Sequence, residues 1–151
     1  LAVLRRHGIS AALIDAGGDL ALGDPPPGTA GWKIGIAPLD PNAIPKQFLV
    51  LAHCGVATSG DAFQHVVIDG VRYSHIVDPR TGFGVTTPCS VTVIGPDAIT
   101  ADGLASALYV LGPDLGIALA DRTDGVAARI VYQEGATVHA AESAAFGRTK
   151  E

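Results

Sequence analysis

Short apolar segments separated by turns rich in glycine and proline recur along most of this chain. Apolar or alternating positions predict strands over residues 11–16, 32–36, 48–57, 63–68, 71–76, 90–94, 127–132 and 137–140. Asp69-Gly70 stands between two of these segments and is a strong β-hairpin signal. Glu134-Gly135 predicts a second, closing hairpin, and residues 24–31 and 38–45 are expected to be loops.

Helical spacing is clearest over residues 96–112, where Gly112-Pro113 is expected to end the helix because proline cannot continue it. The predicted apolar stripe of this helix consists of Ile99, Leu104, Leu108 and Leu111. A second helix is expected over 114–121 with Asp114 as its N-cap. Residues 1–7 resemble the end of a helix that Gly8 stops, and the tail 141–151 is expected to fray. Hairpins combined with neighbouring helices indicate an α+β fold.

Composition narrows the class of protein. The chain has 151 residues, of which 48% are hydrophobic and 17% charged, which fits one globular domain with a sizeable core. The net charge of −5 without a long basic run argues against a nucleic-acid partner. No apolar run reaches the roughly 18 residues of a membrane span. Leu1 lies within a helix-like run without an initiator methionine, so we expect a piece of a longer protein.

The two cysteines carry little functional information. Cys54 and Cys89 both lie in apolar, strand-like contexts, without a neighbouring cysteine at metal-ligand spacing. Buried free thiols are therefore the default expectation, and a disulfide stays open. The cellular compartment stays open as well.

The helix over 96–112 carries a possible metal site. Asp102 and Ser106 are four residues apart and share a helix face. Their oxygen atoms suit a hard cation such as magnesium, and the expected position of Asp102 near the helix start favours its ionised form. The alternative is a polar rim on an ordinary buried helix, and the pair alone favours that alternative.

His75 and Asp78 are the best pair for acid–base chemistry. A histidine three residues before an aspartate, just beyond a strand, can be oriented by that carboxylate and accept a proton near neutral pH. In the alternative, residues 78–82 form a rigid turn in which Asp78 pairs with Arg80. Without further context the spacing favours the turn.

Two turns are rich in groups that bind phosphate. Residues 58–61 follow an apolar strand and offer hydroxyls and a flexible glycine. Gly17-Gly18-Asp19 follows another strand and allows close backbone approach to a ligand. Both segments are also ordinary turn sequences.

Five segments in order resemble the ApbE family of FAD:protein FMN transferases. They are 14–19 (IDAGGD), 32–36 (WKIGI), 57–61 (ATSGD), 74–82 (SHIVDPRTG), and 90–97 (SVTVIGPD) with 100–106 (TADGLAS). Together they cover nearly all of the chain to about residue 121. The resemblance implies a single ApbE-like, T-fold-like domain with a mixed, largely antiparallel sheet and two adjacent helices.

The resemblance also implies an activity. Members of the family bind FAD and magnesium, cleave the pyrophosphate, and attach FMN through a phosphoester to a threonine or serine of a target flavoprotein. By resemblance, Asp102 and Ser106 are the side-chain ligands of the metal, although the family usually has threonine where Ser106 stands. His75 would be the base that activates the acceptor hydroxyl, and Asp78 would hold it.

The remaining positions follow from the same resemblance. His75 and the backbone around Ile76 would contact FAD, and Ser59 and Gly60 would lie by the pyrophosphate. Gly17, Gly18 and Asp19 are expected to be architectural.

One feature of the family is expected to be missing. Its N-terminal half carries a Lys-Gly helix segment, a further metal ligand and much of the FAD pocket. Residues 1–151 therefore resemble the C-terminal portion, and the isolated chain is expected to be weakly active or inactive. Two alternatives stay open: a magnesium-dependent FAD pyrophosphatase giving FMN and AMP, and an inactive flavin-binding fragment. The family resemblance suggests a periplasmic or lipid-anchored protein, with a cytoplasmic location open.

Overall fold

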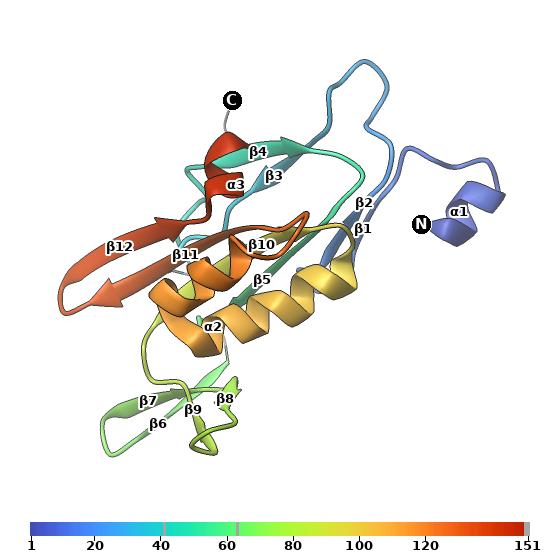
Figure 1. Cartoon of the computed structure of the whole chain (residues 1–151). Helices are drawn as coiled ribbons and strands as arrows, with labels where there is room; N and C mark the ends of the chain where they lie inside the picture. Colours follow the sequence, from blue (N-terminus) through green and yellow to red (C-terminus); the bar gives the residue numbers. More distant parts are fainter. Residues whose placement is uncertain (41, 63, 150–151) are drawn as a thin grey trace.

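A six-stranded antiparallel sheet forms the centre of the computed structural model, which describes residues 1–40, 42–62 and 64–149. The strand order is β1-β2-β5-β10-β11-β12 (Figure 1). These strands are β1 (Leu13–Asp15), β2 (Leu20–Leu22), β5 (Gly55–Gly60), β10 (Cys89–Gly95), β11 (Ala127–Glu134) and β12 (Thr137–Glu142). All five pairings are antiparallel, which confirms the predicted α+β class with a largely antiparallel sheet.

Each face of the sheet has its own apolar core. Helix α2 (Ala98–Ala120) covers one face and packs on Ala57, Val91 and Val93. The opposite face carries Val56 and Ile94, one residue along each strand, because side chains alternate between the two faces. There the strands β3 (Trp32–Gly35) and β4 (Phe48–Leu51) and the helix α3 (Ala144–Arg148) provide the cover. Figure 1 shows α2 and the β3–β4 pair on opposite sides of the sheet.

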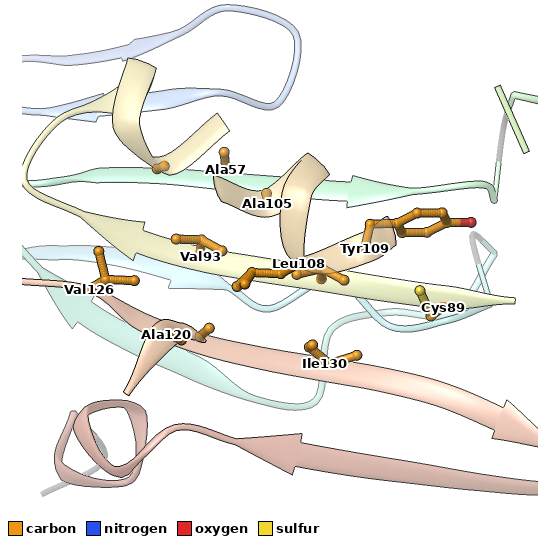
Figure 2. Packing of buried hydrophobic residues seen from close by; sticks show 12 residues of the cluster. Ala57, Cys89, Val93, Ala105, Leu108, Tyr109, Ala120, Val126 and Ile130 are labelled. Carbon is orange, nitrogen blue, oxygen red and sulfur yellow. The ribbon is translucent and has the colours of Figure 1, made fainter. Parts of the chain in front are cut away.

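Helix α2 lies directly on the sheet because small residues form its contact face. Its buried residues are Ala101, Ala105, Leu108, Tyr109, Gly116 and Ala120 (Figure 2 labels four of them). The predicted stripe was partly wrong, because Ile99 is 87% exposed. At the start of α2, a Cβ on Gly55 would lie 2.1 Å from the carbonyl carbon of Asp97, so only glycine fits there.

The predicted break at Gly112-Pro113 is present. Gly112 has φ 77° and ψ −179°, a conformation essentially restricted to glycine, and it divides the ribbon of α2 into two helical segments. Pro113 follows as the first residue of the second segment, where its missing N–H costs nothing. Asp114 therefore lies within the second helical segment and does not serve as the predicted N-cap. Asp97 caps the start of α2, its carboxylate accepting from the Thr100 N–H at 2.8 Å.

Two small hairpins project below the sheet in Figure 1. They are β6 (His65–Ile68) with β7 (Val71–Ser74), and β8 (Val77–Asp78) with β9 (Phe83–Gly84). The Asp69-Gly70 turn is confirmed, with φ values of 50° and 79°, as the two-residue turn between paired strands requires. Phe63, at the start of the predicted hairpin, lies outside the described residues.

Other predicted boundaries need correction. The strand expected over 48–57 is two strands, β4 and β5, because His53 adopts φ 56° between them. Residues 141–149 of the predicted tail are not frayed, because the Ser143 hydroxyl caps α3 and Phe146 is fully buried. Residues 150–151 lie outside the described residues. At the other end, α1 (Ala2–Arg6) confirms the predicted helix end, with Gly8 at φ 79°.

The sequence predicts no segment long enough to span a membrane, and helix α2 is an exception. Among the described residues it is one helix whose length and apolar composition would suffice to cross a membrane. The kink at Gly112 interrupts it, and the face with Ala105 and Leu108 packs on the sheet. The core of the domain explains the apolar residues on that face, whereas Ile99 and Leu115 of the same helix are exposed.

Candidate active site

The candidate metal ligands lie on the exposed flank of α2. Asp102 is exposed and Ser106, one turn later, is half-buried. Asp102 lies in the second turn of the helix, beyond the first turn where the helix dipole acts most strongly. The carboxylate that the dipole stabilises is therefore that of Asp97 at the N-terminus. The Ser106 hydroxyl lies 3.1 Å from the hydroxyl of Ser59 on β5. The structure thus brings together two residues, 47 positions apart, that the sequence assigned to the metal and to the pyrophosphate.

Ser59 and Gly60 do not share a face of the sheet. Ser59 faces α2 along with Ala57, whereas Gly60 lines a pocket of about 430 Å³ under the β3–β4 side. This pocket is lined by Gly17, Gly18, Gly35, Ala37, Pro38, Leu39, Ala43, Pro45, Thr58, Gly60, Ala62, Cys89 and Ser90. The sequence prediction placed both residues by the pyrophosphate, and neighbouring residues of a strand point to opposite faces of the sheet. Ser59 is the residue that reaches α2.

Asp19 lies closer to the candidate site than its expected architectural role implies. The turn between β1 and β2 carries this half-buried carboxyl. Its pKa is raised, first by burial and then by the negative charges of Asp102 and Asp15. Because the Asp19 carboxylate interacts electrostatically with Asp102, it adds negative potential at the position where a cation would bind. No sequence spacing between residues 19 and 102 signals this proximity.

His75 follows β7 directly and is anchored by a single backbone carbonyl. Its N–H donates to the Gln64 carbonyl at 3.1 Å, and its Nδ1 lies 3.0 Å from the same oxygen. A carbonyl only accepts, so Nδ1 carries the proton in this arrangement. In the neutral imidazole this leaves Nε2 as the acceptor, which is the state that a general base needs.

Asp78 pairs with Arg80, as the turn alternative predicted, and not with His75, as the family resemblance implied. Its carboxylate receives Arg80 in two parallel bonds, Nε to Oδ1 at 2.9 Å and Nη2 to Oδ2 at 2.8 Å. Hydrogen bonds from Arg80 lower the pKa of Asp78 below its usual value. The interpretation that Asp78 holds His75 is therefore wrong in this structure, and the turn alternative is the one observed. Because both oxygens of the carboxylate accept hydrogen bonds from Arg80, the orientation of the Asp78 side chain is fixed by that ion pair.

The same arginine ties the turn to helix α2. Arg80 Nη2 also donates to the carbonyl of Val110 at 3.4 Å. Gly112 breaks the helix just beyond this residue. Backbone carbonyls at a helix end lack N–H partners within the helix, so they can accept hydrogen bonds from a cationic side chain such as that of Arg80. Asp78 consequently acts by fixing Arg80, and through it the segment that carries His75, against α2.

Ile76 has both backbone groups engaged within the protein. Its N–H donates to the Ser74 hydroxyl at 3.0 Å, and its carbonyl accepts from the Val85 N–H at 3.0 Å. The half-buried side chain packs against the core under α2. In this structure, therefore, neither the N–H nor the carbonyl of Ile76 is left without a hydrogen bond for the expected contact with FAD.

The donor set fits a hard cation in part. Asp102 and Ser106 offer oxygen atoms on one helix face, and Ser59 adds a second hydroxyl, all of which suit magnesium. Within residues 1–40, 42–62 and 64–149 there is no group of three or more His, Cys, Asp or Glu side chains placed to hold a metal. Magnesium prefers six oxygen ligands, so most of its shell would come from water, phosphate or other protein segments.

Sequence comparison identifies the family. Residues 1–130 match the ApbE family. The chain is 35% identical to the FAD:protein FMN transferase of Treponema pallidum over 144 residues, covering 87% of this chain and 39% of that protein. It is 36% identical to the FAD:protein FMN transferase of Vibrio cholerae over 121 residues, covering 78% of this chain and 36% of that protein. The chain thus spans less than half the length of these relatives.

Solved structures agree with the sequence comparison. The apo flavinyl transferase ApbE of Pseudomonas stutzeri superposes with a TM-score of 0.81 at 36% identity, covering 98% of this chain and 46% of that one. The flavin transferase ApbE of Vibrio cholerae gives 0.84 at 30% identity, with 98% and 47% covered. The chain belongs to the ApbE family.

Proposed function

We propose that this chain forms the C-terminal portion of an enzyme that transfers FMN from FAD to a threonine or serine hydroxyl of a target flavoprotein. The observation that carries the proposal is the Ser59–Ser106 contact at 3.1 Å. It joins the strand end suited to a pyrophosphate to the helix suited to a cation. The names of the relatives, FAD:protein FMN transferases, supply the reaction.

In this proposal the residues of α2 hold a cation that neutralises the negative charge of the substrate. Asp102 and Ser106 would hold Mg²⁺, with the hydroxyl of Ser59 beside it. When bound, the cation neutralises negative charge on the pyrophosphate, which phosphoryl transfer requires. Asp19 adds to the negative potential that attracts the cation. The cation and the pyrophosphate of FAD would thereby meet where Ser59 of β5 lies against Ser106 of α2.

His75 supplies the proton acceptor in the proposed reaction. The acceptor hydroxyl oxygen forms a bond to the FMN phosphorus, and the bond from that phosphorus to the bridging oxygen breaks, releasing AMP. The hydroxyl proton passes to Nε2 of His75, which is the acceptor nitrogen of the neutral imidazole when the Gln64 carbonyl accepts the Nδ1 proton. Asp78 and Arg80 keep this segment in place and do not touch the reacting atoms.

Acceptor dependence separates transfer from hydrolysis. The full-length protein that contains this chain is incubated with FAD and MgCl₂, and AMP release is followed with and without an acceptor flavoprotein. We expect AMP only when the acceptor is present, in a one-to-one ratio with bound FMN. Rapid AMP release without acceptor would instead indicate a FAD pyrophosphatase.

Two variants of Ser106 test the assignment of α2. Ser106→Ala removes the hydroxyl that would face the cation, so a higher MgCl₂ concentration is expected for half-maximal rate. Ser106→Thr is the matched control because it keeps a hydroxyl at the same position. An unchanged magnesium dependence in Ser106→Ala would reject the metal role. The isolated 151-residue chain, titrated with FAD with and without MgCl₂, tests the remaining alternative of a flavin-binding fragment.

A further inference from the structure

The hydroxyl of Tyr109 is buried without a hydrogen-bond partner. The side chain is 1% exposed, and its hydroxyl is the one such orphaned side-chain atom in the part of the chain that the structure describes. Figure 2 shows the ring extending from α2 towards the end of the core where Cys89 lies, with the oxygen pointing away from Leu108. A buried polar atom without a partner is costly, so its presence calls for a physical explanation.

Two buried polar side chains interact electrostatically with this hydroxyl. Ser74 is 5% exposed and Asp61 is 2% exposed. Burial raises the pKa of Tyr109 most strongly; the Ser74 hydroxyl lowers it, and Cys89 and Asp61 raise it. Opposite effects of this kind are expected when Ser74 is placed to donate to the tyrosine oxygen and Asp61 is placed to accept from its hydroxyl.

Both neighbours have hydrogen-bonding capacity left. The Ser74 oxygen accepts from the Ile76 N–H at 3.0 Å, so the proton of its hydroxyl is available to donate. Asp61 receives Arg72 Nε on Oδ2 at 2.5 Å, and a carboxylate has further lone pairs on its second oxygen. The tyrosine hydroxyl, with one proton and an acceptor oxygen, matches both.

The three residues belong to the three segments of the candidate site. Asp61 follows the end of β5, two positions after Ser59, and Ser74 immediately precedes His75. Tyr109 lies one turn beyond Ser106 on α2. Their meeting point is therefore where the candidate phosphate strand, the candidate base and the candidate metal helix are joined below the surface.

We infer that Tyr109 is a positioning residue whose hydroxyl, in the assembled active site, accepts a hydrogen bond from Ser74 and donates one to Asp61. This link holds α2 at a set distance from the ends of β5 and β7. It rests on the proposed function, because the distance matters only if Asp102, Ser106 and His75 act on one substrate. A small displacement of reacting groups is enough to slow a positioned reaction strongly.

Kinetics of the full-length protein test the link. Tyr109→Phe keeps the ring in the core and removes only the hydroxyl. We expect kcat for FMN transfer to fall about 10- to 100-fold, with the KM for FAD unchanged and the thermal midpoint no lower than that of the wild type. Ser74→Ala should have a similar effect, and the double variant should be no worse than the poorer single one. Tyr132→Phe, which removes a hydroxyl on β11, is the control and should keep the wild-type kcat.

Amide hydrogen exchange provides a readout that does not depend on catalysis. The Ile76 N–H bonds to Ser74, so it should exchange faster in Tyr109→Phe than in the wild type or in Tyr132→Phe. Unchanged exchange together with unchanged kcat, while His75→Ala abolishes transfer, would overturn the link and leave the proposed function standing. If the wild type transfers no FMN, the proposed function fails, and unchanged exchange at Ile76 would still overturn the link.

Discussion

Single residues in this site are positioned by contacts with backbone groups as well as by contacts between side chains. His75 is set by the Gln64 carbonyl, and Ile76 is held by the Ser74 hydroxyl. The sequence spacing identified His75 and Asp78 but not these partners, because a carbonyl contact leaves no residue-type signal. The Asp78–Arg80 pair was present in the sequence as the turn alternative, and two residues of separation made it the shorter connection.

Acid should remove the contribution of the Asp78–Arg80 pair to stability. The pKa of Asp78 in the folded protein lies below the usual 3.8, so the folded state binds fewer protons than the unfolded one. The stabilisation is therefore complete well above pH 3.8 and is lost as the pH falls through the lowered value. Denaturation midpoints in urea between pH 7 and pH 2 should show Asp78→Asn less stable than wild type, with a gap that closes below pH 3.8.

The partner residue provides the control for this effect. Arg80→Gln should lose the same increment over the same pH range, and the double variant should lose no more. A stability gap of constant size from pH 7 to pH 2 would show that Asp78 acts through its shape and not through its charge.

At the scale of elements, the sequence predicted which helices and strands exist better than it predicted where each begins and ends. The apolar alternation of residues 90–94 identified β10, and the turn Asp69-Gly70 identified its hairpin. Strands β2, β8 and β9, two or three residues long, are too short to carry a period. Four of the six buried residues of α2 are alanine or glycine, and a search for large apolar side chains does not detect such small residues.

Gly112, at the kink in α2, should be costly to replace because of its backbone conformation. Gly112 has φ 77° and ψ −179°, so Gly112→Ala is expected to lower the free energy of unfolding by about 1–3 kcal/mol. It should also weaken the contact of Arg80 with the Val110 carbonyl. Urea denaturation followed by circular dichroism measures the change.

The same helix contains a matched control. Gly103 lies in the regular part of α2, and a Cβ there would meet nothing within 4 Å. Gly103→Ala should therefore stabilise the protein by about 0.5–1 kcal/mol. Equal effects of the two substitutions would refute the account of the kink.

At the scale of the whole molecule, the two cores follow from alternation on one sheet, but their partners do not. Sequence patterns indicated which strands are apolar, yet not that α3 and β3–β4 close one face while α2 closes the other. Such contacts depend on the strand order, which crosses from β2 to β5 and from β5 to β10. The approach of Asp19 to Asp102 has the same origin, since it joins the β1–β2 turn to α2.

The buried thiols report on the integrity of this assembly. Cys54 and Cys89 are both free, and burial raises the pKa of each, that of Cys89 to about 12. Little thiolate forms at pH 8, so labelling of Cys89 by a thiol reagent should follow global unfolding, whereas half-buried Cys54 should react earlier. Mass spectrometry after timed labelling distinguishes the two. Equally fast labelling of both in the native protein would contradict the closed packing of β10 under α2.

The most direct test of the central claim is the mass of an acceptor flavoprotein after incubation with FAD, MgCl₂ and the full-length protein that contains this chain. The account predicts that the wild type adds one FMN to a threonine or serine of the acceptor. It further predicts that His75→Ala lowers the transfer rate by about 10²–10⁴-fold, as expected for loss of a general base. An acceptor that gains FMN equally fast with His75→Ala, or none with the wild type, would contradict the account.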